Sequence, residues 1–110
     1  MKSTFIHRGD IGTIFQLIVT DKDGIPIDIS TASIKFIYFH SPAGQNIKKT
    51  AAFFTDGTDG ILQYVGIVGD IDVFGLWSIE GYVETTLGKF FTEKSNFTVY
   101  STLAPETQVV

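Results

Sequence analysis

Two acidic turns contain the residues of this sequence that most resemble metal ligands. One turn carries Asp21 and Asp23 before a glycine, and the other carries Asp56 and Asp59 before a glycine. Carboxylates spaced in this way occur in calcium-binding loops, where a bidentate glutamate at the twelfth position completes the coordination. The twelfth position counted from Asp21 is Ala32, so the EF-hand pattern is not met. Asp and Gly are also the ordinary residues of tight turns, and we therefore predict turns without a metal site. A noncanonical site that uses Asp21, Asp23 and Asp28 is the alternative.

Catalytic chemistry needs titratable or nucleophilic groups that converge, and few such groups are present. The two histidines, His7 and His40, lie in or beside predicted strands, and neither belongs to a recognised serine-nucleophile motif. The sequence contains no cysteine, which excludes disulfides, thiolate metal sites and thiol nucleophiles. It also lacks a glycine-rich phosphate-binding motif. We predict a protein that is not an enzyme and that has no cofactor.

The charge and hydropathy of the chain limit its partners. The formal net charge of the 110 residues is −4. Phosphate backbones are bound by clustered Lys and Arg, so we expect no nucleic acid partner. No apolar run approaches the ~18 residues that a membrane-spanning helix requires, and the first residues contain no apolar signal-peptide core. We therefore expect no association with a membrane.

Aromatic side chains offer one further kind of chemistry, which is stacking against a sugar ring. A tyrosine presents a flat apolar face and a hydroxyl group. Of the four tyrosines, Tyr82 is the strongest candidate, because it alternates in phase with Ser78, Glu80 and Glu84 and so points outward from a strand. An ordinary cross-strand contact also explains a tyrosine at this position. A carbohydrate-binding or adhesion module for a bacterial cell-surface saccharide is thus the alternative function.

The element that must organise the fold is a long hairpin over residues 75–99. Successive side chains of a strand face opposite sides, and the first arm alternates apolar and polar residues. A turn is expected at Leu87-Gly88, and in the second arm Phe91 is expected to share the face of Phe97 and Val99. The predicted core residues of the hairpin, which include the single tryptophan, are Trp77, Ile79, Val83 and Phe97.

Other strands are expected to pack around this hairpin. Short extended or alternating segments, each bounded by turn residues, occur at 4–7, 13–20, 33–41, 46–54 and 61–65. About seven antiparallel strands without a helix of normal length predict an all-β fold, specifically an immunoglobulin-like β-sandwich. A small closed barrel is the alternative architecture. We expect a single domain over residues 1–100 and a C-terminal tail over residues 101–110.

Several predicted strands are apolar on both faces. A two-sheet domain needs only one apolar face per strand. In the strand at 13–20, Ile14 and Ile18 lie behind an apolar face, and the segments around residues 37–39 and 90 show the same excess. Crossing strands and twisted edges explain such residues without a partner, whereas contiguous exposed apolar area would mark an interface. The residues that we expect at an interface are Ile37, Phe39, Phe90, Leu103 and Val109.

The order of the turn motifs along the chain resembles a known family. The motifs, in chain order, are Gly9-Asp10-x-Gly12, Asp23-Gly24-x-Pro26-x-Asp28, Pro42-x-Gly44, Asp56-Gly57-x-Asp59-Gly60 and Gly75-x-Trp77. In this order and spacing, which covers most of the chain from Phe5 to Tyr100, they resemble the immunoglobulin-like N-terminal domain of tailed-phage baseplate upper proteins.

This resemblance implies a non-enzymatic component of a phage tail tip or baseplate that joins the tail hub to receptor-binding proteins. The partners are then other phage tail or baseplate proteins, with self-association into a homo-oligomer left open. The implied location is the virion, after assembly in the cytoplasm of the bacterial host. Members of that family usually continue into a helical stalk and further modules, whereas this sequence ends at Val110. The difference affects the expected connecting role more than the fold.

Overall fold

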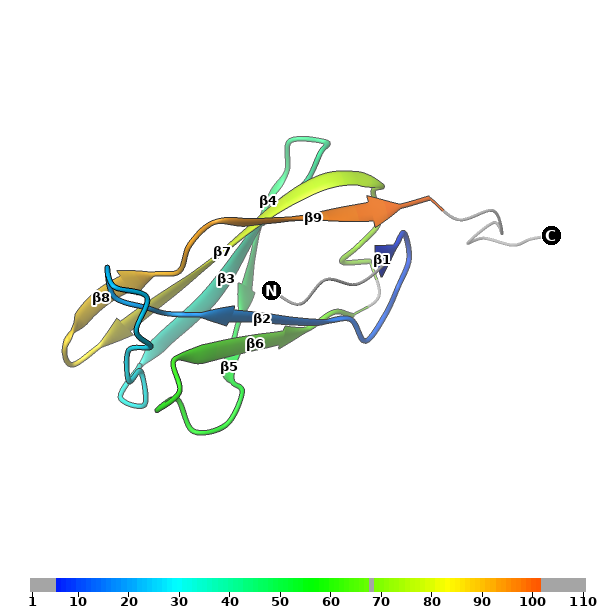
Figure 1. The fold of residues 1–110 in the computed structure, drawn as a ribbon. Coiled ribbons are helices and arrows are strands. Elements are labelled where there is room, and N and C mark those ends of the chain that lie inside the picture. Colours follow the sequence, from blue (N-terminus) through cyan, green and yellow to red (C-terminus); the bar gives the residue numbers. More distant parts are fainter. Residues whose placement is uncertain (1–5, 68, 102–110) are drawn as a thin grey trace.

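The computed structural model describes residues 6–67 and 69–101, which form two β-sheets packed face to face as an all-β, immunoglobulin-like sandwich (Figure 1). These residues form no helix, and so contain no helix that could span a membrane. These residues form nine strands, two of them only two residues long, compared with the predicted number of about seven. The strands in chain order are β1 (Ile6–His7), β2 (Ile14–Ile18), β3 (Ile34–His40), β4 (Asn46–Thr50), β5 (Ala52–Phe53), β6 (Ile61–Val65), β7 (Gly75–Thr85), β8 (Gly88–Phe91) and β9 (Ser95–Tyr100).

The large sheet is organised around β7, which pairs with β3, β8 and β9. The strand order is β1-β9-β7-β3-β4, and β8 pairs with the C-terminal end of β7. All pairs are antiparallel except β1 and β9, which run parallel. Alternate residues of β7 from Trp77 to Val83 are buried and the intervening ones are half-buried, as the period of two predicts. The organising role expected for this strand is confirmed.

The small sheet covers the inner face of the large one and has the strand order β2-β6-β5. Phe15 and Leu17 of β2 and Leu62 of β6 are buried between the sheets. The single strand predicted at 46–54 is wrong: the chain leaves the large sheet after β4, passes through the buried Ala51, and enters the small sheet as β5. Two separate sheets, rather than one closed ladder, distinguish this sandwich from a barrel.

The second arm of the long hairpin is divided by a β-bulge. Tyr82 lies opposite Phe91, and Ile79 lies opposite Ser95, so three steps along β7 correspond to four steps on the other arm. The extra residue reverses which side chains face inward. Phe91 is therefore 59% exposed, and Phe90 is the ring that packs against the core. The prediction that Phe91 shares the buried face of β9 is wrong for this reason.

Thr92 fixes the position of the bulge. The backbone N–H of Gly81 donates to the Thr92 hydroxyl oxygen at 2.8 Å, and the backbone N–H of Thr92 donates to the carbonyl of Gly81 at 3.0 Å. The buried Thr92 hydroxyl is satisfied both as acceptor and as donor, because it also donates to the carbonyl of Glu93. The tight turn of the hairpin precedes it, with Thr85 paired to Gly88.

The core between the sheets is dominated by aromatic rings. Trp77, Ile79, Val83 and Phe97 are all buried, which confirms the predicted core of the hairpin. Phe15 meets Phe39 edge-on with 5.1 Å between ring centroids, and lies at the same centroid distance from Phe97. Such edge-to-face pairs contribute beyond the area they bury. The indole is enclosed in this cluster, as the fold prediction requires.

Candidate binding surfaces

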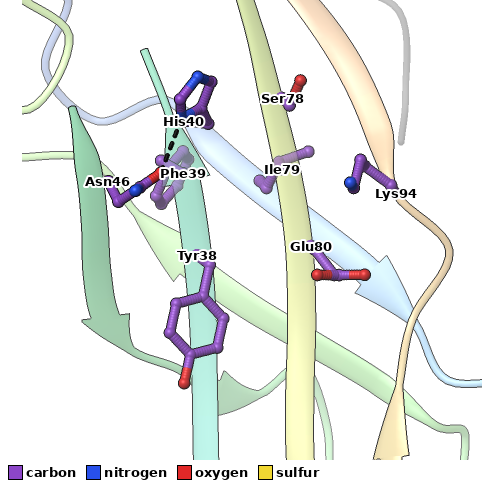
Figure 2. A pocket seen from close by; sticks show the side chains of 8 residues that line it. All are labelled: Tyr38, Phe39, His40, Asn46, Ser78, Ile79, Glu80 and Lys94. Atoms are coloured by element: carbon purple, nitrogen blue, oxygen red, sulfur yellow. Dashed lines mark hydrogen bonds between the residues drawn. The ribbon is translucent and has the colours of Figure 1, made fainter. Parts of the chain in front are cut away.

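The outer face of the large sheet carries a shallow hollow of about 390 Å³. Figure 2 shows the residues around it, which come from β3, β4, β7 and the segment before β9. The strand register places His40 between Asn46 and Ser78, and Tyr38 between Lys48 and Glu80. The residues that line the hollow are Tyr38, Phe39, His40, Asn46, Ser78, Ile79, Glu80 and Lys94.

One side of the hollow is polar. Nδ1 of His40 lies 2.7 Å from Oδ1 of Asn46. The Ser78 hydroxyl donates to Oδ1 of Asn96 at 3.0 Å. These bonds join side chains on neighbouring strands and hold them on the surface of the sheet. The arrangement presents amide, imidazole and hydroxyl groups on one face of the sheet.

Next to the polar side, the same face becomes aromatic. Phe36, Tyr82 and Phe91 occupy one cross-strand row of β3, β7 and β8. The rings of Tyr82 and Phe91 are 4.7 Å apart, and the Lys48 ammonium lies 4.6 Å from the centroid of the Phe36 ring. Neighbouring side chains therefore cover much of Phe36 and Tyr82, and Tyr38 is the ring at the edge of the hollow.

Tyr82, the predicted stacking residue, is half-buried on this outer face. Its hydroxyl donates to the Glu84 carboxylate at 2.6 Å. This hydrogen bond favours the protonated hydroxyl and raises the pKa of Tyr82 to about 12. The outward direction predicted for Tyr82 is confirmed, but its ring is engaged by Phe91 and its hydroxyl by Glu84.

A second surface lies on the opposite side of the sandwich and is apolar. We call it the β2–β6 outer face, and define it by Ile14, Ile18, Ile61 and Val65. Ile14 lies opposite Val65, and Ile18 lies opposite Ile61. Ile14, Ile18 and Val65 are 57%, 43% and 44% exposed. The excess of apolar side chains that the sequence indicates at Ile14 and Ile18 is therefore present on the surface.

Of the predicted interface residues, Ile37 and Phe39 face inward. They are 0% and 6% exposed, so the prediction that they lie on an outer face is wrong. Phe39 lies opposite Ile79 and Ile37 opposite Gly81, and residues opposite each other share a face. Phe90 is half-buried against the core. The remaining two predicted interface residues, Leu103 and Val109, lie outside the described residues.

The acidic turns use their carboxylates to satisfy backbone groups. The Asp21 carboxylate accepts the N–H groups of Asp23 and Ile25, and Asp56 accepts that of Thr58. Such bonds are typical of Asx turns. Across residues 6–67 and 69–101, no three His, Cys, Asp or Glu side chains gather in a way that could hold a metal ion.

One charged cluster links the two sheets at the edge of the core. The Lys49 ammonium of β4 lies 2.9 Å from the Asp70 carboxylate, which also accepts the hydroxyl of Tyr64 from β6 and the N–H of Ile67. Burial by itself would raise the pKa of Asp70, but these three donors together hold it below its usual value of 3.8. The cluster has the geometry of a structural clamp.

Comparisons with known proteins define the fold but not a family. No protein-family model matches the sequence, and no curated protein matches it. Among solved structures, this fold is similar to the crystal structure of CopC from Methylosinus trichosporium OB3b. The TM-score is 0.52 and the sequence identity 14%, with 90% of this chain and 86% of that chain covered. At this identity the similarity supports the β-sandwich and carries no information on function.

Proposed function

We propose that this protein is a non-enzymatic structural module that acts through protein–protein interfaces in a phage or prophage tail or baseplate. The observation that carries the proposal is the exposed β2–β6 outer face. Exposed apolar side chains mark an interaction site when they are grouped on one face of a domain instead of being scattered singly. Here the exposed Ile14 and Val65 lie opposite each other, and the exposed Ile18 lies opposite the half-buried Ile61, on the far side of the Gln16–Gln63 pair.

The polar residues of this face do not oppose docking. Gln16 lies opposite Gln63 between the two apolar pairs, and its side-chain amide donates to Oε1 of Gln63 at 3.2 Å. Each glutamine thus satisfies part of the hydrogen-bonding capacity of the other. The five registered residue pairs of β2 and β6 contain no charged residue. Burying this surface therefore incurs no desolvation of an ion. The expected partner is a protein with an uncharged, apolar surface.

The free energy gained by burying these side chains is large enough to account for one part of an interface. Fully burying an exposed Ile or Val contributes about 1.5–3 kcal/mol. Ile14, Ile18 and Val65 are each near half exposed, so each contributes roughly half of that value. β2 is also the terminal strand of the small sheet, and an edge strand offers backbone groups to an added strand.

The assignment to a phage tail or baseplate is supported by the order of the turn motifs from Gly9 to Trp77. On this proposal the partners are other tail or baseplate proteins, and the protein resides in the virion after assembly in the bacterial cytoplasm. The proposed role requires rigid surfaces and no reaction.

The test is assembly with the products of the neighbouring genes. The chain is co-expressed with each of them, and complexes are measured by size-exclusion chromatography with light scattering, which also reports self-association. The double variant Ile14→Lys/Ile18→Lys should abolish the complex without lowering the unfolding temperature. Leu87→Lys is the matched control, because Leu87 is 73% exposed at the hairpin turn.

Two results would contradict the proposal. One is a gene neighbourhood without virion components. The other is a double variant that assembles as well as the wild type, which would remove the β2–β6 outer face from the interface.

A further inference from the structure

The hollow on the outer face of the large sheet is not explained by a role in assembly. The β2–β6 outer face is apolar, whereas the hollow combines one exposed aromatic ring with several polar side chains (Figure 2). Its volume of about 390 Å³ is at the lower end of the ~300–1,000 Å³ range of small-molecule sites. The two surfaces belong to different sheets, so both can be occupied together.

The polar side chains retain hydrogen-bonding capacity directed at the solvent. Oδ1 of Asn46 can only accept, so Nδ1 of His40 donates to it. This leaves Nε2 of His40 and the side-chain NH₂ group of Asn46 for a ligand. Among the described residues, Glu80 and Lys94 have no ion pair or side-chain hydrogen bond to the protein. The hollow thus offers acceptors and donors within one small area.

Tyr38 supplies the apolar component. Its side chain is 37% exposed, and its ring meets Phe36 edge-on with 6.2 Å between centroids. That contact holds the ring in place, so little conformational entropy is lost when a ligand packs on it. Figure 2 shows the ring extending from β3 beside the hollow, with Glu80 on the neighbouring strand. An aromatic ring next to a carboxylate and an amide matches a pyranose, which has a C–H face and a rim of hydroxyls.

We propose that this hollow binds a neutral saccharide, with the sugar ring against Tyr38 and its hydroxyls bonded to Glu80, Asn46 and His40. A charged ligand fits less well, because the hollow itself is lined by one carboxylate, Glu80, and one ammonium group, Lys94. A phosphate ligand needs clustered cations. A lipid needs an enclosed apolar cavity, whereas five of the eight residues that line this hollow are polar or charged, not counting the tyrosine.

The experiment uses the complete chain on an array of neutral oligosaccharides built from hexoses and N-acetylhexosamines. Wild type should bind at least one of them, and Tyr38→Ala should weaken that binding by about tenfold or more. Glu80→Gln should also weaken it, because it removes a charged acceptor while keeping the shape. Phe54→Ala is the control: Phe54 is an exposed aromatic next to β5 of the other sheet and should leave binding unchanged.

Amide NMR shifts with the best oligosaccharide locate the site. Shifts confined to residues 38–40, 46, 78–80 and 94 support the proposal. Three results would overturn it: shifts on β2 and β6, equal binding by Tyr38→Ala and wild type, or no binding to any oligosaccharide. These outcomes are independent of the assembly assay, since Tyr38 lies outside the β2–β6 outer face.

Discussion

The indole of Trp77 stacks on the ring of Phe97, with 5.8 Å between the ring centroids and 19° between the planes. The two residues lie directly opposite each other on β7 and β9. Phe39 meets both rings edge-on from β3, and the indole N–H donates to the carbonyl of Val73 at 2.9 Å. Three strands of the large sheet therefore contribute to one aromatic cluster in which the single buried polar group is satisfied.

Replacing Trp77 with alanine should lower the free energy of unfolding by about 3–5 kcal/mol, through lost burial and the cavity that remains. A loss of this size approaches the whole stability of a small domain. Urea titration followed by far-UV circular dichroism measures it. Leu76→Ala, one residue away but 60% exposed, should change the value by less than about 0.5 kcal/mol. Equal losses for the two variants would contradict the enclosed position of the indole.

Gly81 should not tolerate a side chain. A Cβ at this buried position of β7 would lie 2.9 Å from Cγ2 of Thr92 and 3.1 Å from Cδ1 of Leu62. Gly81→Ala should therefore destabilise the fold by about 1–3 kcal/mol through overpacking. The measurement is again the free energy of unfolding in urea.

A second variant separates overpacking from other effects of the substitution. Thr92→Ser removes the Cγ2 atom and keeps the hydroxyl that accepts the N–H of Gly81. In a Thr92→Ser background, Gly81→Ala should cost clearly less than in the wild type, giving a measurable coupling energy between the two sites. Additive effects would show that the contact with Thr92 is not the cause.

Alternation along the strands was sufficient to predict much of the fold. The inward phase of β7 was predicted correctly because its apolar side chains recur every second residue from Trp77 onward. The bounds of β6, Ile61–Val65, were also predicted correctly, since acidic and glycine turn residues precede it. The phase and the bounds of a strand depend on residues that are adjacent in the sequence, and so they can be predicted from it.

The inward face of β3 could not be predicted in this way. Both of its faces are apolar, so alternation by itself does not distinguish them. The choice depends on the register with β7, which places Phe39 beside Ile79 and Ile37 beside Gly81. The outward Phe36 is then partly covered by the Lys48 side chain from β4. These relationships join residues distant in sequence.

The bulge and the hollow were missed for a related reason. The segment around Thr92 and Glu93 has no glycine or proline to indicate a bulge, so Phe90 and Phe91 were assigned to the wrong faces. The hollow is assembled from three strands and the segment before a fourth, and its residues are recognisable as a group only when the strand order is known. Tyr38 could be identified as an exposed aromatic only after the face of β3 was fixed.

The clamp between Lys49, Asp70 and Tyr64 should make stability sensitive to acid. The pKa of Asp70 in the folded protein is below its usual value of 3.8. A group with a lowered folded pKa stabilises the protein above the unfolded pKa, and this contribution is lost as the pH falls through the folded value. The free energy of unfolding should therefore decrease below about pH 4 in wild type, and less steeply in Asp70→Asn. Urea titrations at a series of pH values measure both slopes, and parallel slopes would contradict the role of Asp70.

The hydroxyl of Tyr82 should ionise at a much higher pH than an ordinary tyrosine. Its hydrogen bond to the Glu84 carboxylate raises the pKa of Tyr82 to about 12, from a usual value of 10.0. Glu84→Gln replaces the charged acceptor with a neutral one, so the pKa should move back toward 10.0. The ring carbon that bears the hydroxyl reports ionisation in a ¹³C NMR titration. Glu80→Gln is the matched control on the same face, because Glu80 is not the acceptor of this hydroxyl. A wild-type pKa near 10.0, or an equal effect of the two variants, would show that Tyr82 and Glu84 are not bonded in solution.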